Sequence, residues 1–385
     1  MTSRERKELR YQRRQEKRKE KRKALIESIG SAEEVFNFHD MFVFGEQCCR
    51  GVMWKQSTQN FHRHLFSRTA MNRKRALNNY KMKRLVRFSI NERGKTRMIE
   101  APHIDDRQIH KTLTQKVLLP LYEPRLIYDN GASLKKKGLK FSQDYFDSRL
   151  RRHIRKYGMA GWVIIADFKG FFPNADRNIV KAKHAEIKDD IIRSIADKVT
   201  DAGYGDRGLP LGVEPSQIEM IALPSSIDSY MNCQCRVCTG HYMDDYHIIV
   251  PPHIDPNDAM LKFSRKAKEY GIIVSKNKTQ IIPFGKPLKF CKSKRVFYGI
   301  SIVRSGCRES VKRCRRKIAK FSRSDMKYED IYTSVTSSLS YLQITRNHKR
   351  VLKLKRFFYA RFGFSCEKIE EFRRKDAVYN TQKVS

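Results

Sequence analysis

The chain has 385 residues, of which 40% are hydrophobic, so it can bury a sizeable core and form two or three domains or one body with subdomains. Its 81 Lys and Arg against 41 Asp and Glu give a formal net charge of +40, which indicates a polyanionic partner, most often nucleic acid. No run of 18 apolar residues occurs and the N-terminus is charged, which disfavours a membrane protein and a signal peptide. Nine irregularly placed cysteines are typical of reduced thiols, so we expect a cytoplasmic protein.

The N-terminal region is basic and predicted to be helical. In residues 3–24, Glu16 and Glu20 precede lysines by three positions, a spacing that favours a solvated helix with i,i+3 ion pairs. Such a helix is either a charged surface or an arm that binds RNA or docks a partner. Residues 25–80 mix apolar and basic helical stretches. We therefore expect a basic helical N-terminal extension.

A β-hairpin is predicted next. Residues 85–90 and 95–102 alternate as short strands do, and Gly94 lies in the turn between them. Side chains two apart on a strand share a face, so Lys95 and Arg97 would lie together and could bind a triphosphate. Two solvated cations on an edge strand are the alternative.

The remaining helices follow from apolar periodicity and charge. Helices are predicted at 108–119, 178–202, 216–230, 259–270 and, strongly basic, at 311–321 and 346–361. The basic helices have apolar residues between their cations, a pattern suited to a nucleic-acid backbone.

Carboxylates end two apolar strands in the middle of the chain. Asp167 closes the strand 162–166, and a Tyr-Met-Asp-Asp turn between two short apolar strands predicts a hairpin with Asp244 and Asp245 at its tip. The paired carboxylates repel one another unless a divalent cation lies between them. With Asp167 they suit two hard cations that align an attacking oxygen, a phosphorus and a leaving pyrophosphate. This pattern predicts nucleotidyl transfer.

A second set of ligand types lies just before this hairpin. Cys233, Cys235, Cys238 and His241 have spacing that could suit zinc. Four ligands within so short a stretch of a strand-bound turn are cramped, so free thiols are the simpler interpretation.

At these residues the chain resembles the reverse transcriptases. Residues 167–172, 208–217 and the Tyr-Met-Asp-Asp turn match three blocks of the family in the family's order. The hairpin at 95–99 and the Phe-Tyr-Gly-Ile stretch at 297–300 match further blocks, so the resemblance spans about residues 84–325. Residues 129–138 resemble the family's Ser-rich and Gly-rich loop, which implies backbone contact with a template phosphate. It implies an α+β fold of the right-hand polymerase type, with fingers, a palm with an antiparallel sheet, and a helical thumb.

The resemblance also divides the chain. The expected parts are the N-terminal extension at 1–83, fingers at 84–160, a palm at 161–290 from which 177–206 returns to the fingers, and a thumb with a basic C-terminal segment at 291–385.

The resemblance assigns site residues one by one. It implies that Asp167, the backbone of Phe168, Asp244 and Asp245 hold two Mg²⁺ ions, with Mn²⁺ as an alternative. Lys278 could protonate the leaving pyrophosphate, although a charged loop lysine is an equal alternative. The implied nucleotide-binding residues are Lys95, Arg97, Phe168, Phe172, Leu211, Gly212 and Gln217.

Two of these positions carry a specific expectation. Phe172 matches an aromatic gate whose ring would collide with a ribose 2′-hydroxyl, and core packing is its alternative. Leu211 lies where other family members have Gln; leucine gives contact but no directional hydrogen bond, so correct and incorrect pairs would differ less in the transition state.

The block at 211–217 distinguishes among reverse transcriptases. Retroviral, retron and group II intron enzymes begin it with Gln and end it in Ser-Pro, whereas enzymes of diversity-generating retroelements begin it with Ile, Val or Leu and end it in Ser-Gln. This chain has the second pattern. The resemblance therefore implies an error-prone RNA-directed DNA polymerase of a bacterium or phage, which makes mutagenised cDNA from a template-repeat RNA, mainly with errors opposite adenines.

The implied partners are template RNA, a cDNA/RNA duplex, dNTPs and a small basic helical accessory protein oligomer, without a membrane. A prokaryotic antiviral defence reverse transcriptase would share the palm and is the main alternative. A non-catalytic RNA-binding protein would usually have lost one of the three aspartates, and all three are present.

Overall fold

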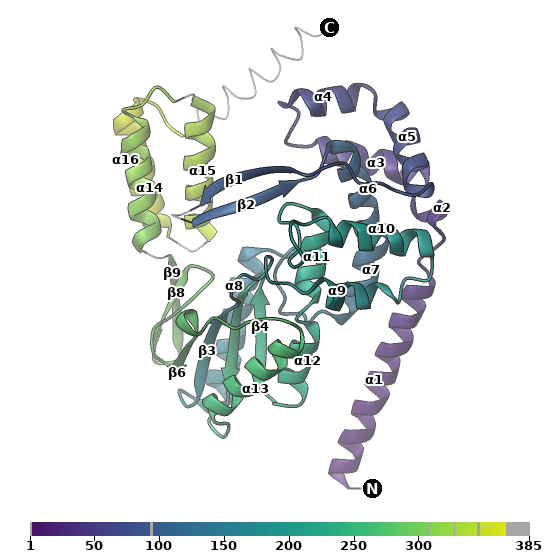
Figure 1. Ribbon diagram of the computed structural model, residues 1–385. Coiled ribbons are helices and arrows are strands. Elements are labelled where there is room, and N and C mark those ends of the chain that lie inside the picture. Colours follow the sequence, from purple (N-terminus) through teal and green to yellow (C-terminus); the bar gives the residue numbers. More distant parts are fainter. Residues whose placement is uncertain (1, 93–94, 307, 327, 345–346, 367–385) are drawn as a thin grey trace.

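The computed structural model describes residues 2–92, 95–306, 308–326, 328–344 and 347–366. The described part combines helices with antiparallel sheets of two, four and three strands (Figure 1). This mixed content agrees with the expected α+β class. Within the described ranges, no helix has both the length and the apolar character needed to cross a membrane.

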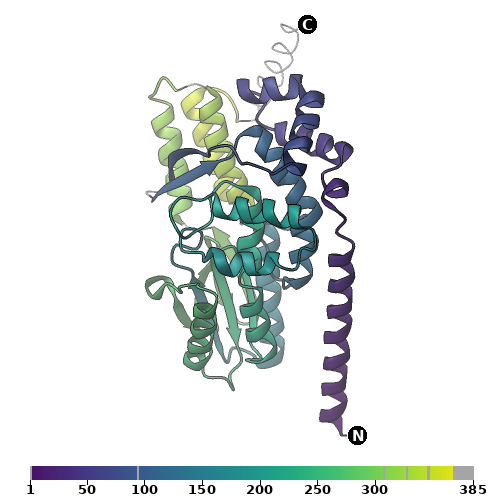
Figure 2. The same cartoon turned by 45° about the vertical axis from the view of Figure 1, so that its right-hand side comes forward.

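Helices make up the N-terminal region. They are α1 (Ser3–Glu27), α2 (Ala32–Val35), α3 (Phe38–Cys49), α4 (Gln56–Arg63) and α5 (Leu65–Leu77). Helix α1 starts at a capping box formed by Thr2 and Glu5, and it runs down the outside of the molecule (Figure 2). The helical prediction for residues 3–80 is confirmed. Glu27 of α1 forms ion pairs with Lys23 at 3.9 Å, an i,i+4 spacing, and with Lys188 at 3.8 Å.

A two-stranded ribbon follows. Strands β1 (Val86–Glu92) and β2 (Lys95–Ala101) pair antiparallel over their whole length, which confirms the predicted hairpin. Residues 93–94 of its turn lie outside the described residues. In both views the ribbon extends from the N-terminal helices toward the C-terminal ones (Figures 1 and 2).

The predicted helix at 108–119 starts earlier and changes geometry. It consists of α6 (Ile104–Leu113), the π-helical turn η1 (Thr114–Leu118) and α7 (Leu119–Tyr122), followed by the 3₁₀ turn η2 (Glu123–Arg125). Pro120 has no N–H with which to continue the regular i→i−4 pattern at this point. A loop over the predicted residues 129–138 then leads to α8 (Leu139–Tyr157).

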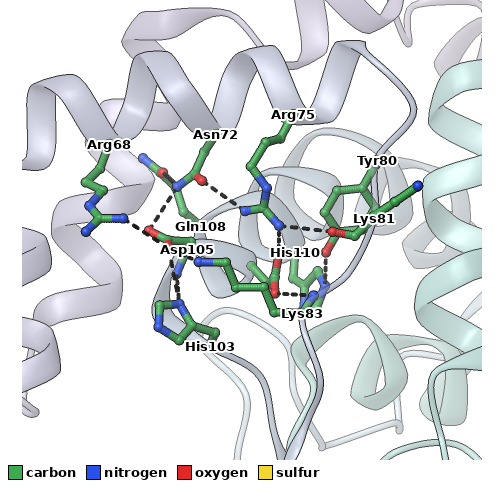
Figure 3. Close-up of polar contacts among 11 residues, drawn as sticks. Arg68, Asn72, Arg75, Tyr80, Lys81, Lys83, His103, Asp105, Gln108 and His110 are labelled. Carbon is green, nitrogen blue, oxygen red and sulfur yellow. Dashed lines mark hydrogen bonds and ion pairs between the residues drawn. The ribbon is translucent and has the colours of Figure 1, made fainter.

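Buried charges join α5, α6 and the start of the ribbon (Figure 3). The carboxylate of Asp106 accepts hydrogen bonds from Arg75 Nη2 at 2.7 Å, Tyr80 Oη at 3.2 Å and the backbone N–H of Lys83 at 2.9 Å. Asp105 accepts from Lys83 Nζ at 2.6 Å. Both aspartates are almost completely buried. We call these five residues the α5–α6 polar cluster, and it fixes the entry of the ribbon onto the helices.

The four-stranded sheet has the order β4-β5-β3-β6. Its strands are β3 (Trp162–Asp167), β4 (Cys238–Tyr242), β5 (Asp245–Val250) and β6 (Gln280–Pro283). Side chains alternate along β3, so Ile164 packs into one core with Phe263, while Val163 packs into another with Phe146 of α8. The central strand therefore separates two hydrophobic cores.

Two predicted single helices are pairs of helices. The stretch 178–202 forms α9 (Arg177–His184) and α10 (Asp190–Asp201), and the stretch 216–230 forms α11 (Glu214–Ala222) and α12 (Ser225–Cys233). Asp189 starts α10 by accepting hydrogen bonds from the N–H groups of residues 191 and 192. Pro224 lacks the N–H needed to continue α11. The prediction of continuous helices was wrong because it followed periodicity across these boundary signals.

The described C-terminal part holds a small sheet and four α-helices. Its elements are α13 (Pro256–Glu269), the 3₁₀ turn η3 (Lys276–Lys278), β7 (Leu288–Phe290), β8 (Ser293–Tyr298), β9 (Ser301–Gly306), α14 (Arg308–Phe321), α15 (Tyr328–Ile344) and α16 (His348–Phe362). Helices α14, α15 and α16 surround their own core around Ile318, Leu339 and Phe358. The two predicted basic helices correspond to α14 and α16. Arg346 and residues 367–385 lie outside the described residues.

Candidate active site

The carboxylate turn is built by strand register. In the β4–β5 hairpin Tyr242 pairs with Asp245, which leaves Met243 and Asp244 as a two-residue turn. Met243 has a φ of 55°, a left-handed conformation that costs a residue other than glycine roughly 1–2 kcal/mol. Asp245 stands opposite Asp167 at the end of the β3–β5 pairing. Directly opposed residues have Cβ atoms about 5 Å apart, so the fold brings the predicted aspartates together.

Repulsion among the three carboxylates disfavours the charged form of Asp244 and of Asp245. Burial and the carboxylate of Asp167 raise the pKa of Asp244. Burial, Asp244 and Asp167 raise the pKa of Asp245 to about 6. The cations of Lys278 and Arg97 act in the opposite direction on the pKa of Asp244. The site therefore concentrates negative charge that a cation would stabilise.

The donors suit a divalent cation in chemistry. Carboxylate oxygens are hard ligands of the kind that Mg²⁺ and Mn²⁺ prefer. In the described ranges, no group of three or more His, Cys, Asp or Glu side chains is arranged to hold a metal ion. Instead, Nζ of Lys278 at the end of η3 forms an ion pair with Asp167. The lysine thus supplies positive charge at the carboxylates in this arrangement.

Asp228 is a supporting residue that the sequence analysis missed. It is fully buried on α12, where it accepts a hydrogen bond from Tyr246 Oη at 2.9 Å and lies 3.2 Å from His241 Nε2. His241 and Tyr246 are cross-strand neighbours whose rings stack with centroids 4.6 Å apart. Asp228 therefore ties both strands of the hairpin to α12 one residue behind the turn. Asp228 stands between Ile227 and Ser229 in the predicted helix, and this local sequence holds no signal of its contact with the hairpin.

The cysteine cluster does not converge. Cys233 ends α12 and is exposed, whereas Cys238 lies on β4, where burial raises the pKa of its thiol to about 11. His241 is already engaged by Asp228. The described residues therefore give no support for the zinc alternative.

The predicted nucleotide residues lie partly beside the turn. Arg97 is exposed on β2 and close enough to Asp244 to lower its pKa. Lys95 belongs to the same strand, but its side chain lies outside the described residues. Phe168 is 1% exposed, so its ring belongs to the core and does not contact a nucleotide. Phe171 is buried and Phe172 is half-buried. Phe171 is therefore the ring that packs in the core, and Phe172 remains partly accessible.

The predicted block at 211–217 packs against the ribbon. The backbone N–H of Glu100 donates to the carbonyl oxygen of Leu211 at 2.8 Å. Gly212 has a φ of 124°, and a Cβ there would lie 3.0 Å from the carbonyl oxygen of Glu100, so only glycine fits. Gly212 and Gln217 line a cavity with a volume of about 640 Å³.

That cavity is separate from the carboxylate turn. Its lining residues come from α3, α6, η1 and α11 and include the cations of Arg107, Lys111 and Lys135, whereas the three aspartates are not among them. Of the residues predicted for one nucleotide site, Gly212 and Gln217 line this cavity and Arg97 lies close to Asp244.

The chain was compared with protein families, curated proteins and solved structures. Residues 82–323, more than half of the chain, match the family model described as reverse transcriptase (RNA-dependent DNA polymerase). A search of curated proteins found no match. Among solved structures, an apo telomerase from Candida tropicalis truncated from the C-terminal domain is similar at 16% identity and a TM-score of 0.43, with 57% of this chain and 55% of that chain covered. The chain thus spans about half the length of that structure. From the family match over residues 82–323, we conclude that the chain belongs to the reverse transcriptase (RNA-dependent DNA polymerase) family.

Proposed function

We propose that the protein is an RNA-directed DNA polymerase whose catalytic residues are Asp167, Asp244 and Asp245. The observation that carries the proposal is the register that sets Asp245 opposite Asp167 with Asp244 in the adjoining turn, inside the matched reverse transcriptase domain. In this proposal the four-stranded sheet is the palm, the β1–β2 ribbon belongs to the fingers, and α14, α15 and α16 form the thumb. The substrates are template RNA and dNTPs.

Two divalent ions, which we propose to be Mg²⁺, would lower the charge of the reacting phosphates and orient the attacking oxygen. The carboxylates of Asp167, Asp244 and Asp245, with the backbone of Phe168, would hold them. Lys278 must then release Asp167, which leaves its ammonium group beside the site where pyrophosphate departs. Arg97, and Lys95 on the same strand, would hold the triphosphate. Phe172 would exclude a 2′-hydroxyl.

The polymerase proposal is tested by Asp244→Asn. The variant should lose primer extension on an RNA template by several orders of magnitude and keep RNA binding, because only one ligand charge is removed. Asp258→Asn is the matched control, since Asp258 is an exposed helix residue paired with Lys262. Extension by Asp244→Asn at the rate of Asp258→Asn would reject the catalytic assignment.

We further propose that the enzyme is error-prone and serves a diversity-generating retroelement, with adenines of a template-repeat RNA as the main sites of error. Leu211 supports the proposal, because it offers an incoming nucleotide contact without a directional hydrogen bond. Its backbone is fixed to β2 through Glu100, so its side chain can be exchanged without releasing the loop. A small basic helical accessory oligomer is the proposed protein partner, with RNA bridging two basic proteins.

Sequencing of cDNA from an RNA with all four bases tests this part. Leu211→Gln should restore a hydrogen bond worth about 1 kcal/mol, which is about fivefold in discrimination. Leu211→Met is the control, because it changes shape without adding a hydrogen bond. If the wild-type protein copies adenine as faithfully as the other bases, the defence reverse transcriptase becomes the better assignment.

A further inference from the structure

A groove lies between α1 and the body of the molecule, away from the carboxylate turn. Its volume is about 910 Å³, and it is bounded by α1, the η2 loop, α8, α12 and the end of α13. Lys19 and Arg22 form its α1 wall, and Tyr128 and Tyr230 lie on the opposite side. Helix α1 passes beside this part of the body in Figure 2. We call this space the α1 groove.

The charge of the α1 groove is strongly positive. Six of its lining residues are basic and one, Asp129, is acidic. Asp129 is bound by Arg149 in a two-pronged ion pair at 2.6 and 2.8 Å. Arg125 is likewise fixed by an ion pair with Glu186. Lys266 is paired with Glu269 at 2.6 Å, so three of the six cations are held by carboxylates, and Lys19 and Arg22 add charge on the outer wall.

The groove also offers aromatic faces and hydroxyl groups. Tyr128 is 60% exposed, and Lys266 Nζ lies 5.5 Å and 5.8 Å from the ring centroids of Tyr230 and Tyr270. Ser and Thr side chains of α12 and β4 complete the lining. Cations that follow a phosphate backbone, combined with exposed rings on which bases stack, are typical of sites for single-stranded nucleic acid. Hydroxyl groups can bind the ribose 2′-hydroxyl.

The size of the groove decides between a strand and a duplex. A volume of 910 Å³ lies at the upper end of the range for pockets that enclose one small ligand. It therefore accepts a few nucleotides of a single strand and excludes a double helix. The excess of basic over acidic residues in the lining disfavours a basic partner protein.

We propose that the α1 groove binds an unpaired segment of RNA, at a site distinct from the carboxylate turn where primer and template would react. The groove would hold part of the RNA outside the copied duplex. This inference goes beyond the proposed polymerase function and does not depend on it, since binding can be measured without catalysis.

The test uses the full chain and a labelled oligouridine of about ten nucleotides, a length within the usual site size of single-strand binders. A short RNA/DNA primer–template is present in excess to occupy the polymerase cleft. Lys19→Glu/Arg22→Glu should bind the oligouridine about 25-fold more weakly at 0.1 M salt, because each of two lost phosphate contacts removes about 0.7 from the salt slope.

The matched control is Lys17→Glu/Lys21→Glu. These residues are exposed on the same helix and do not line the groove, and the change in net charge is identical. This control should bind almost as the wild-type protein does. Tyr128→Ala should weaken binding about fivefold or more through lost stacking, with an unchanged salt slope.

Three results would overturn the inference. They are equal losses in both α1 variants, wild-type affinity in Lys19→Glu/Arg22→Glu, and an equal loss of affinity for duplex RNA in that variant. Primer extension on the short duplex is measured in parallel. If the wild-type protein does not extend the primer but the groove variants lose oligouridine binding, the polymerase proposal is rejected and the groove proposal is retained. If the wild-type protein extends the primer but the groove variants bind oligouridine as the wild type does, the groove proposal is rejected and the polymerase proposal is retained.

Discussion

Replacing Asp106 with alanine should strongly destabilise the protein, because it removes the central acceptor of the α5–α6 polar cluster. Breaking a buried ion pair by deleting one partner costs about 3–5 kcal/mol. Here Arg75 is 22% exposed and also donates to Asn72 and to the carbonyl oxygen of Lys81. Tyr80 Oη still contacts His110 Nε2 at 3.0 Å. These contacts place the expected loss at the lower end, about 3 kcal/mol.

The measurement is urea unfolding followed by circular dichroism, with the free energy of unfolding obtained by linear extrapolation. Asp258→Ala is the control, because it deletes an equally short but exposed i,i+4 pair with Lys262 and should cost less than about 1 kcal/mol. If Asp106→Ala and Asp258→Ala are equally stable, the cluster does not fix the ribbon to the helices as we argue.

Two further predictions concern titration and chemistry. Burial lowers the pKa of His110 to about 4 from an ordinary 6.5. Because the unfolded chain then binds a proton at a higher pH than the folded protein does, the free energy of unfolding should fall by about 3 kcal/mol as the pH drops from 6.5 toward 4. His110→Gln should flatten the unfolding free energy over that interval, and an unchanged pH profile would contradict the prediction. Lys278→Ala should lower kcat for primer extension about 100-fold if Lys278 acts as the general acid. Equal loss at all pH values in Lys278→Arg would instead indicate a purely positional role beside Asp167.

Local sequence signals predicted the elements that carry the candidate site. Two short apolar stretches around the Tyr-Met-Asp-Asp turn were sufficient to predict the β4–β5 hairpin, and Asp167 was correctly placed at the end of β3. The same reasoning failed where two signals competed: periodicity favoured one helix through Pro224, although proline marks a boundary.

Long-range contacts could not be predicted in this way. Asp228 reaches His241 and Tyr246 only after α12 folds against the hairpin, and nothing in its local sequence specifies that contact. Lys19 and Tyr230 are far apart in the sequence, yet both line the α1 groove. Such sites depend on tertiary packing, which a single sequence does not reveal.

The order of strands in the four-stranded sheet has a consequence for folding during synthesis. The central strand β3 pairs with β5 and β6, which are made much later in the chain. The sheet therefore cannot close until residue 283 has left the ribosome, whereas α3, α5 and α6 contact one another within the first third of the chain. Because distant pairings form slowly, we expect the helical N-terminal region to fold first and β3 to wait, with its apolar side chains exposed to chaperones.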